Sequence, residues 1–221
     1  MISQRLQRRL VRHHLPLLIL SAVACTALFV TRPYRDVISR ASFATAYPAL
    51  VLLGITLMLG PWRILRHQRV PVSYDLRRDI GIWAGTLSLL HTVIGQNVHL
   101  RGRPWLYYVY PATSHHAFPL RHDLFGVENI AGLLSALAIL ALLATSCDLL
   151  LRRMGTPAWK RLQRWNYAAF ALAALHAVCY QWNEKNAHAF HLLGFACIAA
   201  AALLQLAGFL ARRSSSVTAS A

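Results

Sequence analysis

Two histidines lie inside apolar stretches of the sequence. His91 follows the run 80–90 and His176 follows the run 167–175. An ionisable side chain inside an apolar helix is costly, so such a residue is a candidate functional residue. Two neutral imidazoles on separate helices suit axial ligation of one haem iron from opposite sides. We therefore take His91 and His176 as the candidate site residues.

The two histidines are predicted to lie at the same depth in helices that run in the same direction. His91 is 13 positions after Arg78, and His176 is 12 positions after Arg164. At about 1.5 Å per residue, both lie roughly 18–20 Å beyond the last basic residue. Glycine, alanine and serine recur near both, which would accommodate a flat cofactor. Such residues are also typical of close helix packing, so interhelical hydrogen bonds or a proton pathway stay open as alternatives.

The composition is that of a membrane protein. The 221 residues are 57% hydrophobic and 14% charged, with a mean hydropathy of +0.42. Soluble domains are roughly 45–50% apolar. The net charge is +16, but the basic residues form short clusters between long apolar runs. This pattern indicates a lipid bilayer as the partner and no nucleic acid.

Six apolar runs reach or approach the roughly 20 residues that a helix needs to cross a bilayer. They are 15–30, 43–62, 80–98, 127–147, 166–182 and 188–211. The sequence therefore predicts an all-α integral membrane protein, a bundle of six transmembrane helices. This domain is expected at 15–211, between a basic N-terminus at 1–14 and a disordered tail at 212–221.

The distribution of Lys and Arg predicts the orientation. With six crossings, 16 of the 23 basic residues fall on the side of the termini and 7 on the other side. Loops rich in Lys and Arg stay in the cytoplasm. Both termini are therefore predicted to be cytoplasmic, in a multi-pass protein of the cell inner (plasma) membrane. The long loop 99–125, rich in Pro, His and Tyr, is then outside.

Two stretches resemble the ferric-reductase-like transmembrane domain family. The first, 76–91, joins Leu-Arg-Arg-Asp to a Gly-containing helix that ends at His91. The second, 145–176, combines Thr-Ser, Arg-Arg-Met-Gly, Trp-Lys-Arg-Leu and His176. Within this family the chain is similar to haem-binding membrane subunits of methionine sulfoxide reductase systems. The resemblance covers 43–211 and implies haem b, with His91 and His176 as axial ligands of the haem iron, and electron transfer through the membrane.

One position departs from the family pattern. Where the family often has a histidine after Trp-Lys-Arg-Leu, this chain has Gln163, 13 residues before His176. One haem is therefore expected. A single haem in the outer half makes transfer from a cytoplasmic flavin harder, and this favours a membrane quinol as the electron donor.

No nicotinamide- or flavin-binding fingerprint occurs in the sequence. We expect a separate donor, either a quinol or a flavin reductase with externally supplied flavin, and an acceptor or periplasmic reductase partner at the outer face. The chain is then an oxidoreductase component with no catalytic residue of its own. A proton-coupled transporter and a cofactor-free structural subunit are the alternatives. Against the transporter, the carboxylates Asp79, Glu128 and Asp148 are expected near span ends.

Further histidines are expected outside the apolar spans. Those predicted at the outer surface or at helix ends, as solvated residues or as a metal site, are His99, His115, His116, His122, His188 and His191. His13 and His14 belong to the basic N-terminus, where we expect them to be solvated.

Overall fold

The described residues form a bundle of helices. A computed structural model describes residues 4–32, 36–66, 74–100, 102–114, 116–184 and 188–218. In chain order the elements are α1 (Gln4–Arg9), the π-helical turn η1 (Leu10–His14), α2 (Leu15–Thr31), α3 (Val37–Leu65), α4 (Tyr74–Gly95), the short 3-10 helix η2 (Pro104–Tyr107), α5 (Leu124–Ala144), α6 (Asp148–Gln163), α7 (Trp165–Glu184) and α8 (His188–Thr218). The predicted all-α class is confirmed.

The six predicted apolar runs correspond to α2, α3, α4, α5, α7 and α8. Four described helical segments are long and apolar enough to cross a membrane: Gln4–Thr31, Val37–Leu65, Leu124–Ala144 and Leu192–Arg213. The helices that carry the two candidate histidines, α4 and α7, are not among these four. The protein is a multi-pass membrane protein.

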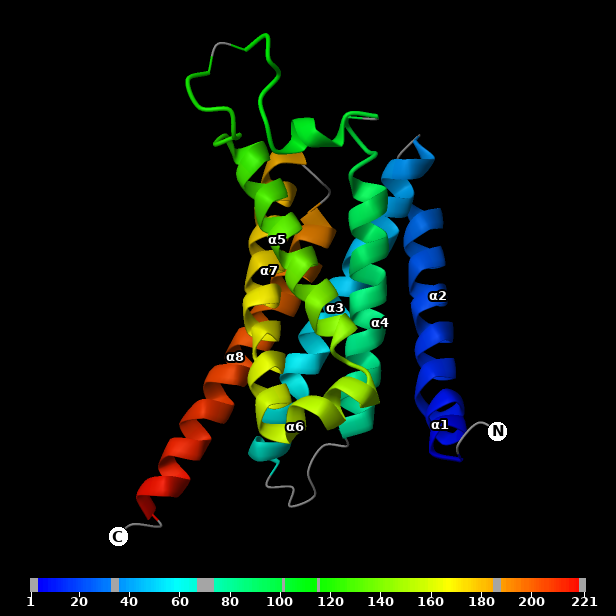
Figure 1. Ribbon diagram of the computed structural model, residues 1–221, viewed down its shortest axis with the longest axis vertical. Coiled ribbons are helices and arrows are strands. Elements are labelled where there is room, and N and C mark those ends of the chain that lie inside the picture. The colour runs from blue at the N-terminus through cyan, green and yellow to red at the C-terminus, as the bar shows by residue number, and fades with distance from the viewer. Residues whose placement is uncertain are drawn as a thin grey trace.

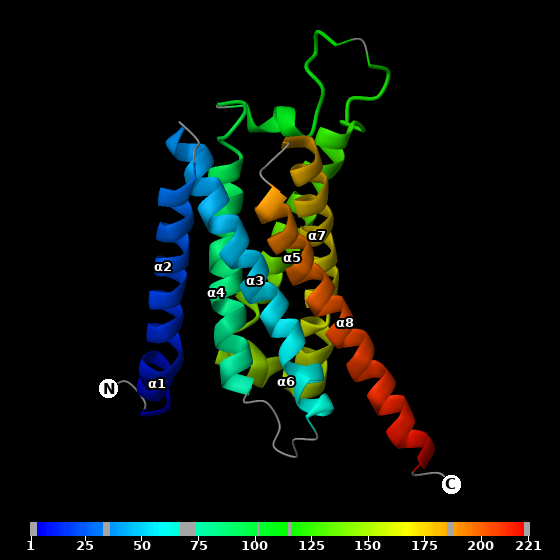
Figure 2. The ribbon, with the colours of Figure 1, turned by 180° about the vertical axis from the view of Figure 1, so that it is seen from behind.

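Helix α3 lies at the centre of the bundle. It packs against α2, α4, α7 and α8, while α5 packs against α4 and α7. Figures 1 and 2 show that the N- and C-terminal segments lie at one end and the loop between α4 and α5 at the other. Helix α2 stands at the edge of the bundle, and α8 leans away from it towards its C-terminal end.

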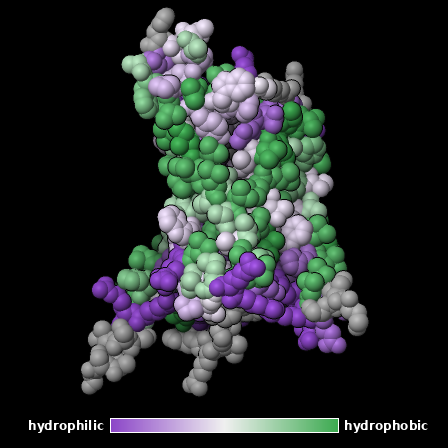
Figure 3. All heavy atoms as spheres, in the orientation of Figure 1, coloured by the Kyte–Doolittle hydropathy of each residue, from purple (hydrophilic) through white to green (hydrophobic). Residues whose placement is uncertain are grey.

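The apolar core lies where α3, α4, α5 and α7 meet. Leu53, Ala84, Ile139 and Phe170, one from each of these helices, are all buried there. Many large apolar side chains also face outwards, and Figure 3 shows them as a broad hydrophobic band above a polar rim near the termini. An apolar surface of this extent is expected to contact lipid.

Three elements differ from the sequence prediction. Helix α3 begins at Val37, six residues before the predicted run, because the Asp36 side chain caps it and accepts a hydrogen bond from the Ser39 backbone nitrogen at 2.9 Å. The segment after α5, predicted as a connection, forms the amphipathic helix α6. At its kink, Gly155 adopts a φ of 71°, in the left-handed region that favours glycine. Helix α8 also continues to Thr218, into the segment that we predicted to be disordered.

A buried carboxylate fastens the N-terminal segment to α4. Asp79 is fully buried and forms an ion pair with Arg9. His13 Nδ1 lies 2.7 Å and His14 Nε2 lies 3.3 Å from its carboxylate oxygens. The prediction that His13 and His14 are solvated is therefore wrong, because the continuous helical segment Gln4–Thr31 lies beside α4 and brings both rings to this carboxylate.

This cluster leads to a prediction about stability. Replacing Asp79 with asparagine removes the carboxylate nearest to the buried Arg9 guanidinium and leaves Arg9 with the more distant Asp75, at 4.0 Å. Breaking a buried ion pair costs about 3 kcal/mol. We expect the SDS concentration at the midpoint of unfolding in mixed micelles to fall clearly. Asp75→Asn is the matched control, since that side chain is 23% exposed and pairs with the largely exposed Arg5. Equal effects of the two substitutions would contradict the stabilising role of Asp79.

Candidate functional site

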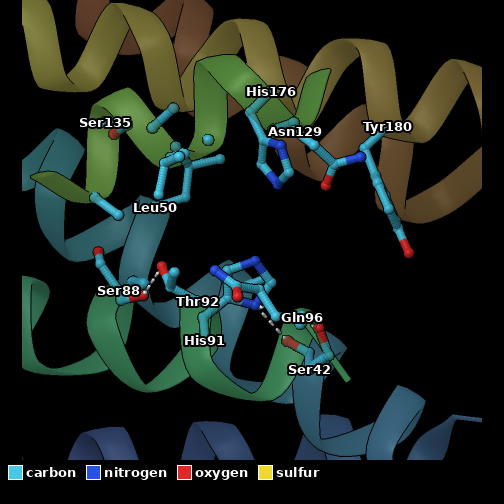
Figure 4. Close-up of a pocket in the computed structure, with 18 of the residues that line it drawn as sticks. Ser42, Leu50, Ser88, His91, Thr92, Gln96, Asn129, Ser135, His176 and Tyr180 are labelled. Atoms are coloured by element: carbon cyan, nitrogen blue, oxygen red, sulfur yellow. Dashed lines mark hydrogen bonds between the residues drawn. The ribbon is translucent and has the colours of Figure 1, made fainter. Parts of the chain in front are cut away.

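The two candidate histidines face each other across one cavity. His91 projects from α4 and His176 from α7, and their ring centroids are 6.2 Å apart with an angle of 59° between the ring planes. Both rings line a cavity of about 310 Å³. Figure 4 shows the two side chains extending into this cavity from opposite sides. Residues that are 85 positions apart in the sequence thus form a single site.

A backbone carbonyl from another helix holds each ring. The Nδ1 atom of His91 lies 2.9 Å from the carbonyl oxygen of Ser42 on α3. The Nδ1 atom of His176 lies 2.8 Å from the carbonyl oxygen of Glu128 on α5. A carbonyl oxygen only accepts hydrogen bonds, so the proton of each neutral ring is on Nδ1. The Nε2 atoms then keep their lone pairs, which is the state in which histidine ligates a metal.

The separation of the rings matches ligation of one metal ion from both sides. A bond from metal to imidazole nitrogen is about 2 Å long, and the ring centroid lies about 1 Å further on, so two such rings have centroids about 6 Å apart. The observed 6.2 Å agrees with this value. A direct hydrogen bond between the rings would use the same Nε2 atoms, and no such bond occurs between these two described residues.

Small residues leave space for the two rings. A Cβ atom added to Gly132 on α5 would lie 2.8 Å from Nδ1 of His176, which is closer than real Cβ contacts. A Cβ atom added to Gly95 would lie 3.8 Å from Cε1 of His91, an ordinary contact. Small residues were expected near the two histidines on their own helices, but the contribution of Gly132 from α5 was not predicted. No signal in the sequence links Gly132 to His176, because their contact depends on how α5 packs against α7.

The end of the cavity nearest the loop between α4 and α5 is lined by aromatic and polar side chains. The Tyr180 hydroxyl lies 3.1 Å from Nε2 of His99, and Gln96 Nε2 donates to the Tyr108 hydroxyl at 3.2 Å. Tyr107, from the long loop, is only 3% exposed and lines the same cavity. This part of the loop between α4 and α5 therefore packs over one end of the site.

The described histidines His116 and His122 of the loop between α4 and α5 form an aromatic cluster and not a metal site. Tyr110 stacks on His116 with centroids 3.7 Å apart, and His122 meets this pair edge-on. The described residues contain no group of three or more His, Cys, Asp or Glu side chains that could hold a metal ion. His115 and the side chains of His188 and His191 lie outside what the structure describes.

The position of Glu128 bears on a possible proton pathway. It lies in the second turn of α5 and is fully buried. Its carbonyl oxygen holds His176, but its neighbour Asn129 is the residue that lines the cavity. No carboxylate is among the described lining residues of this cavity.

Comparison with known proteins identifies the family. No family model matches the chain. The heme-binding subunit MsrQ of protein-methionine-sulfoxide reductase from Yersinia pseudotuberculosis serotype O:1b (strain IP 31758) is 30% identical over 168 residues, which cover 72% of this chain and 70% of the relative. The corresponding subunit of Yersinia pestis (strain Pestoides F) is also 30% identical over 168 residues, with coverages of 72% and 69%. The chain therefore belongs to the MsrQ family of ferric-reductase-like haem-binding membrane subunits.

Proposed function

We propose that this protein is a haem-binding transmembrane electron-transfer subunit, in which His91 and His176 are the axial ligands of one haem b. The observation that carries the proposal is the paired arrangement of the rings. Each Nδ1 atom is occupied by a carbonyl from a neighbouring helix, and the ring centroids are 6.2 Å apart across a shared cavity. The similarity to heme-binding subunits supports it independently.

The haem would supply a one-electron carrier whose potential depends on its ligands and surroundings. The residues of this chain hold the ligands and keep water away. The carbonyls of Ser42 and Glu128 fix the orientation of the two rings and raise their basicity as ligands. Buried apolar residues such as Leu50, Leu53 and Ile139 line the cavity and keep its interior dry.

The proposed topology has six membrane spans, with both termini in the cytoplasm. The protein is proposed to lie in the cell inner (plasma) membrane. Helices α4 and α7 are proposed as the other two membrane spans, because they pack within the same bundle as the four more apolar spans. Both termini lie at the end of the bundle that carries the polar rim, as Figures 1 and 3 show. That arrangement agrees with the excess of basic residues on one side. The helical domain is proposed to span residues 15–211.

The proposed electron path runs to the outer face. The relatives are subunits of protein-methionine-sulfoxide reductase, so we propose a periplasmic reductase as the partner at that face. Tyr180 and His99 connect the neighbourhood of His176 with the outer loop. The electron donor is a separate molecule, either a membrane quinol or a flavin reductase.

A proton-coupled transporter is the second candidate function. The buried Glu128 favours it, because its backbone is hydrogen-bonded to His176. The haem proposal explains more: both rings present Nε2 to one cavity, and Asn129 rather than Glu128 lines it. A cofactor-free structural subunit would leave the matched separation of the rings without a role.

The haem content of the purified protein tests the proposed function. We expect one haem per chain in the pyridine haemochrome assay when the protein is produced with ample haem supply. Gln163 replaces the histidine that a second haem would need, so a second equivalent is not expected. A haem-free protein would support the transporter or the structural subunit, and two haems per chain would refute the single-haem site.

A further inference from the structure

A second cavity lies at the opposite end of the bundle from the outer loop. Its volume is about 490 Å³, and it lies between α3, α4, α5, α6, α7 and α8. Five basic side chains line it: Arg77, Arg78, Lys160, Arg164 and Arg212. They come from α4, from α6 and the residue that follows it, and from α8, so the chain brings positive charge to one place from three distant segments.

Part of this positive charge has no acidic partner among the residues that the structure describes. Arg78 pairs with Asp148 at 2.5 Å. Arg77, Arg164 and Arg212 form no ion pair with any acidic side chain that the structure describes, and no carboxylate is among the described residues that line the cavity. Arginine binds phosphate through several N–H groups at once. The rim of the cavity is therefore suited to a phosphate group.

The inner wall of the same cavity is apolar. Leu53, Ile139 and Leu142 line it, and each is less than a tenth exposed. Two polar side chains of the lining, Asn166 and Thr56, bind each other, since Asn166 Nδ2 donates to Thr56 Oγ1 at 2.9 Å. A ligand that matches both the rim and the wall has a negatively charged head and an apolar chain.

This cavity lacks the side chains that would hold a second haem by its iron. Gln163 lines it at the position where the family often has a histidine. None of its described lining residues is a histidine, cysteine or methionine, which are the usual axial ligands of haem. The cavity is therefore a site of a different kind from the one between His91 and His176.

We propose that this cavity binds an anionic phospholipid of the surrounding membrane. The phosphate of the headgroup lies among Arg77, Arg164 and Arg212 at the rim, and an acyl chain follows the apolar wall. Basic pockets between transmembrane helices are suited to anionic lipid headgroups, and the leaflet on the cytoplasmic side supplies such lipids. A free phosphate ion would leave the apolar wall uncovered, so a lipid fits the cavity better.

Binding of defined lipids to the purified full-length protein tests this proposal. Native mass spectrometry with dioleoylphosphatidylglycerol and with dioleoylphosphatidylcholine should give an affinity at least about tenfold higher for the anionic lipid. Replacing Arg77 and Arg164 together with glutamine should reduce this preference by about tenfold or more. The matched control replaces Arg152 and Arg153 with glutamine, because both are exposed on α6 and neither lines the cavity.

A second variant tests the apolar part of the cavity. Gly81 lines it, and a Cβ atom added there would have its nearest neighbour, Thr56 Cγ2, at 3.9 Å, so Gly81→Leu places a larger side chain inside without changing the charge. We expect weaker binding of the anionic lipid and an unchanged haem spectrum. Gly60→Leu is the control, since nothing lies within 4 Å of a Cβ atom at that position and Gly60 is not among the described lining residues.

The outcomes separate this proposal from others. Equal binding of the two lipids, or equal losses in the cavity and control variants, would overturn it. If inorganic phosphate protects the protein against heat while neither lipid binds preferentially, the site is one for a free anion and the lipid proposal is wrong. Because haem content is measured separately, failure of lipid binding leaves the proposed function untouched.

Discussion

Replacing either His91 or His176 with alanine is expected to remove the haem or to change its ligation. Each substitution deletes one Nε2 atom from the pair that faces the cavity. Loss of a residue that only orients a metal ligand already costs about 10–100-fold in affinity, so loss of the ligand itself should cost at least as much. Haem per chain and the dithionite-reduced visible spectrum of the detergent-purified variants measure this effect.

Controls distinguish loss of a ligand from general misfolding. His122→Ala removes an exposed histidine of the outer loop and should leave the haem content unchanged. Imidazole added to a His91→Gly variant should restore part of the native spectrum, because it can occupy the vacated position beside Ser42. Native haem content and an unaltered spectrum in either alanine variant would show that the replaced histidine is not a ligand.

Replacing Gly132 with alanine should weaken haem binding although Gly132 contributes no ligand. The new methyl group would lie 2.8 Å from Nδ1 of His176, so the ring has to move and its hydrogen bond to the Glu128 carbonyl is disturbed. Because this bond orients the ring, we expect a loss of about 10–100-fold in haem affinity. Titration of haem into the haem-depleted protein gives the affinity directly.

Two other glycines provide graded comparisons for this experiment. Gly60→Ala has nothing within 4 Å of its new methyl group, and Gly95→Ala makes ordinary contacts with Ser42 and His91. Both should retain near-native affinity, and Gly60→Ala gains the same helix propensity as Gly132→Ala, because both of these glycines lie inside helices. If all three variants behave alike, the close approach of Gly132 to His176 has no role in holding the haem.

The positions of the apolar helices and the common depth of the two histidines could be predicted from the sequence, because both follow from the spacing of residues along the chain. Each of the six apolar runs is helical over most of its length, because the length of an apolar run is a local property of the chain. The predicted runs 80–98 and 127–147 extend three residues past the ends of α4 and α5. The nearly equal distances of His91 and His176 from the preceding basic residues, 13 and 12 positions, indicated a common depth, and the rings lie across one cavity. These predictions needed helix geometry but no knowledge of which helices are neighbours.

The features that depend on the packing of distant segments could not be predicted. Burial of Asp79 against Arg9, His13 and His14 requires the first helix to lie beside α4. The contact between Gly132 and His176 likewise requires α5 to pack on α7. Helix α6 was missed for another reason: its mixed polar composition with Gly155 and Pro157 is typical of a connection, although it is amphipathic.

The most direct test of the central claim is the electron paramagnetic resonance spectrum of the oxidised, haem-loaded native protein, recorded together with its visible spectrum. Ligation by His91 and His176 predicts a low-spin ferric signal typical of two imidazole ligands and sharp bands after reduction. A high-spin ferric signal would show that at least one of the two histidines does not bind the iron. A protein that takes up no haem under these conditions would contradict the electron-transfer function itself.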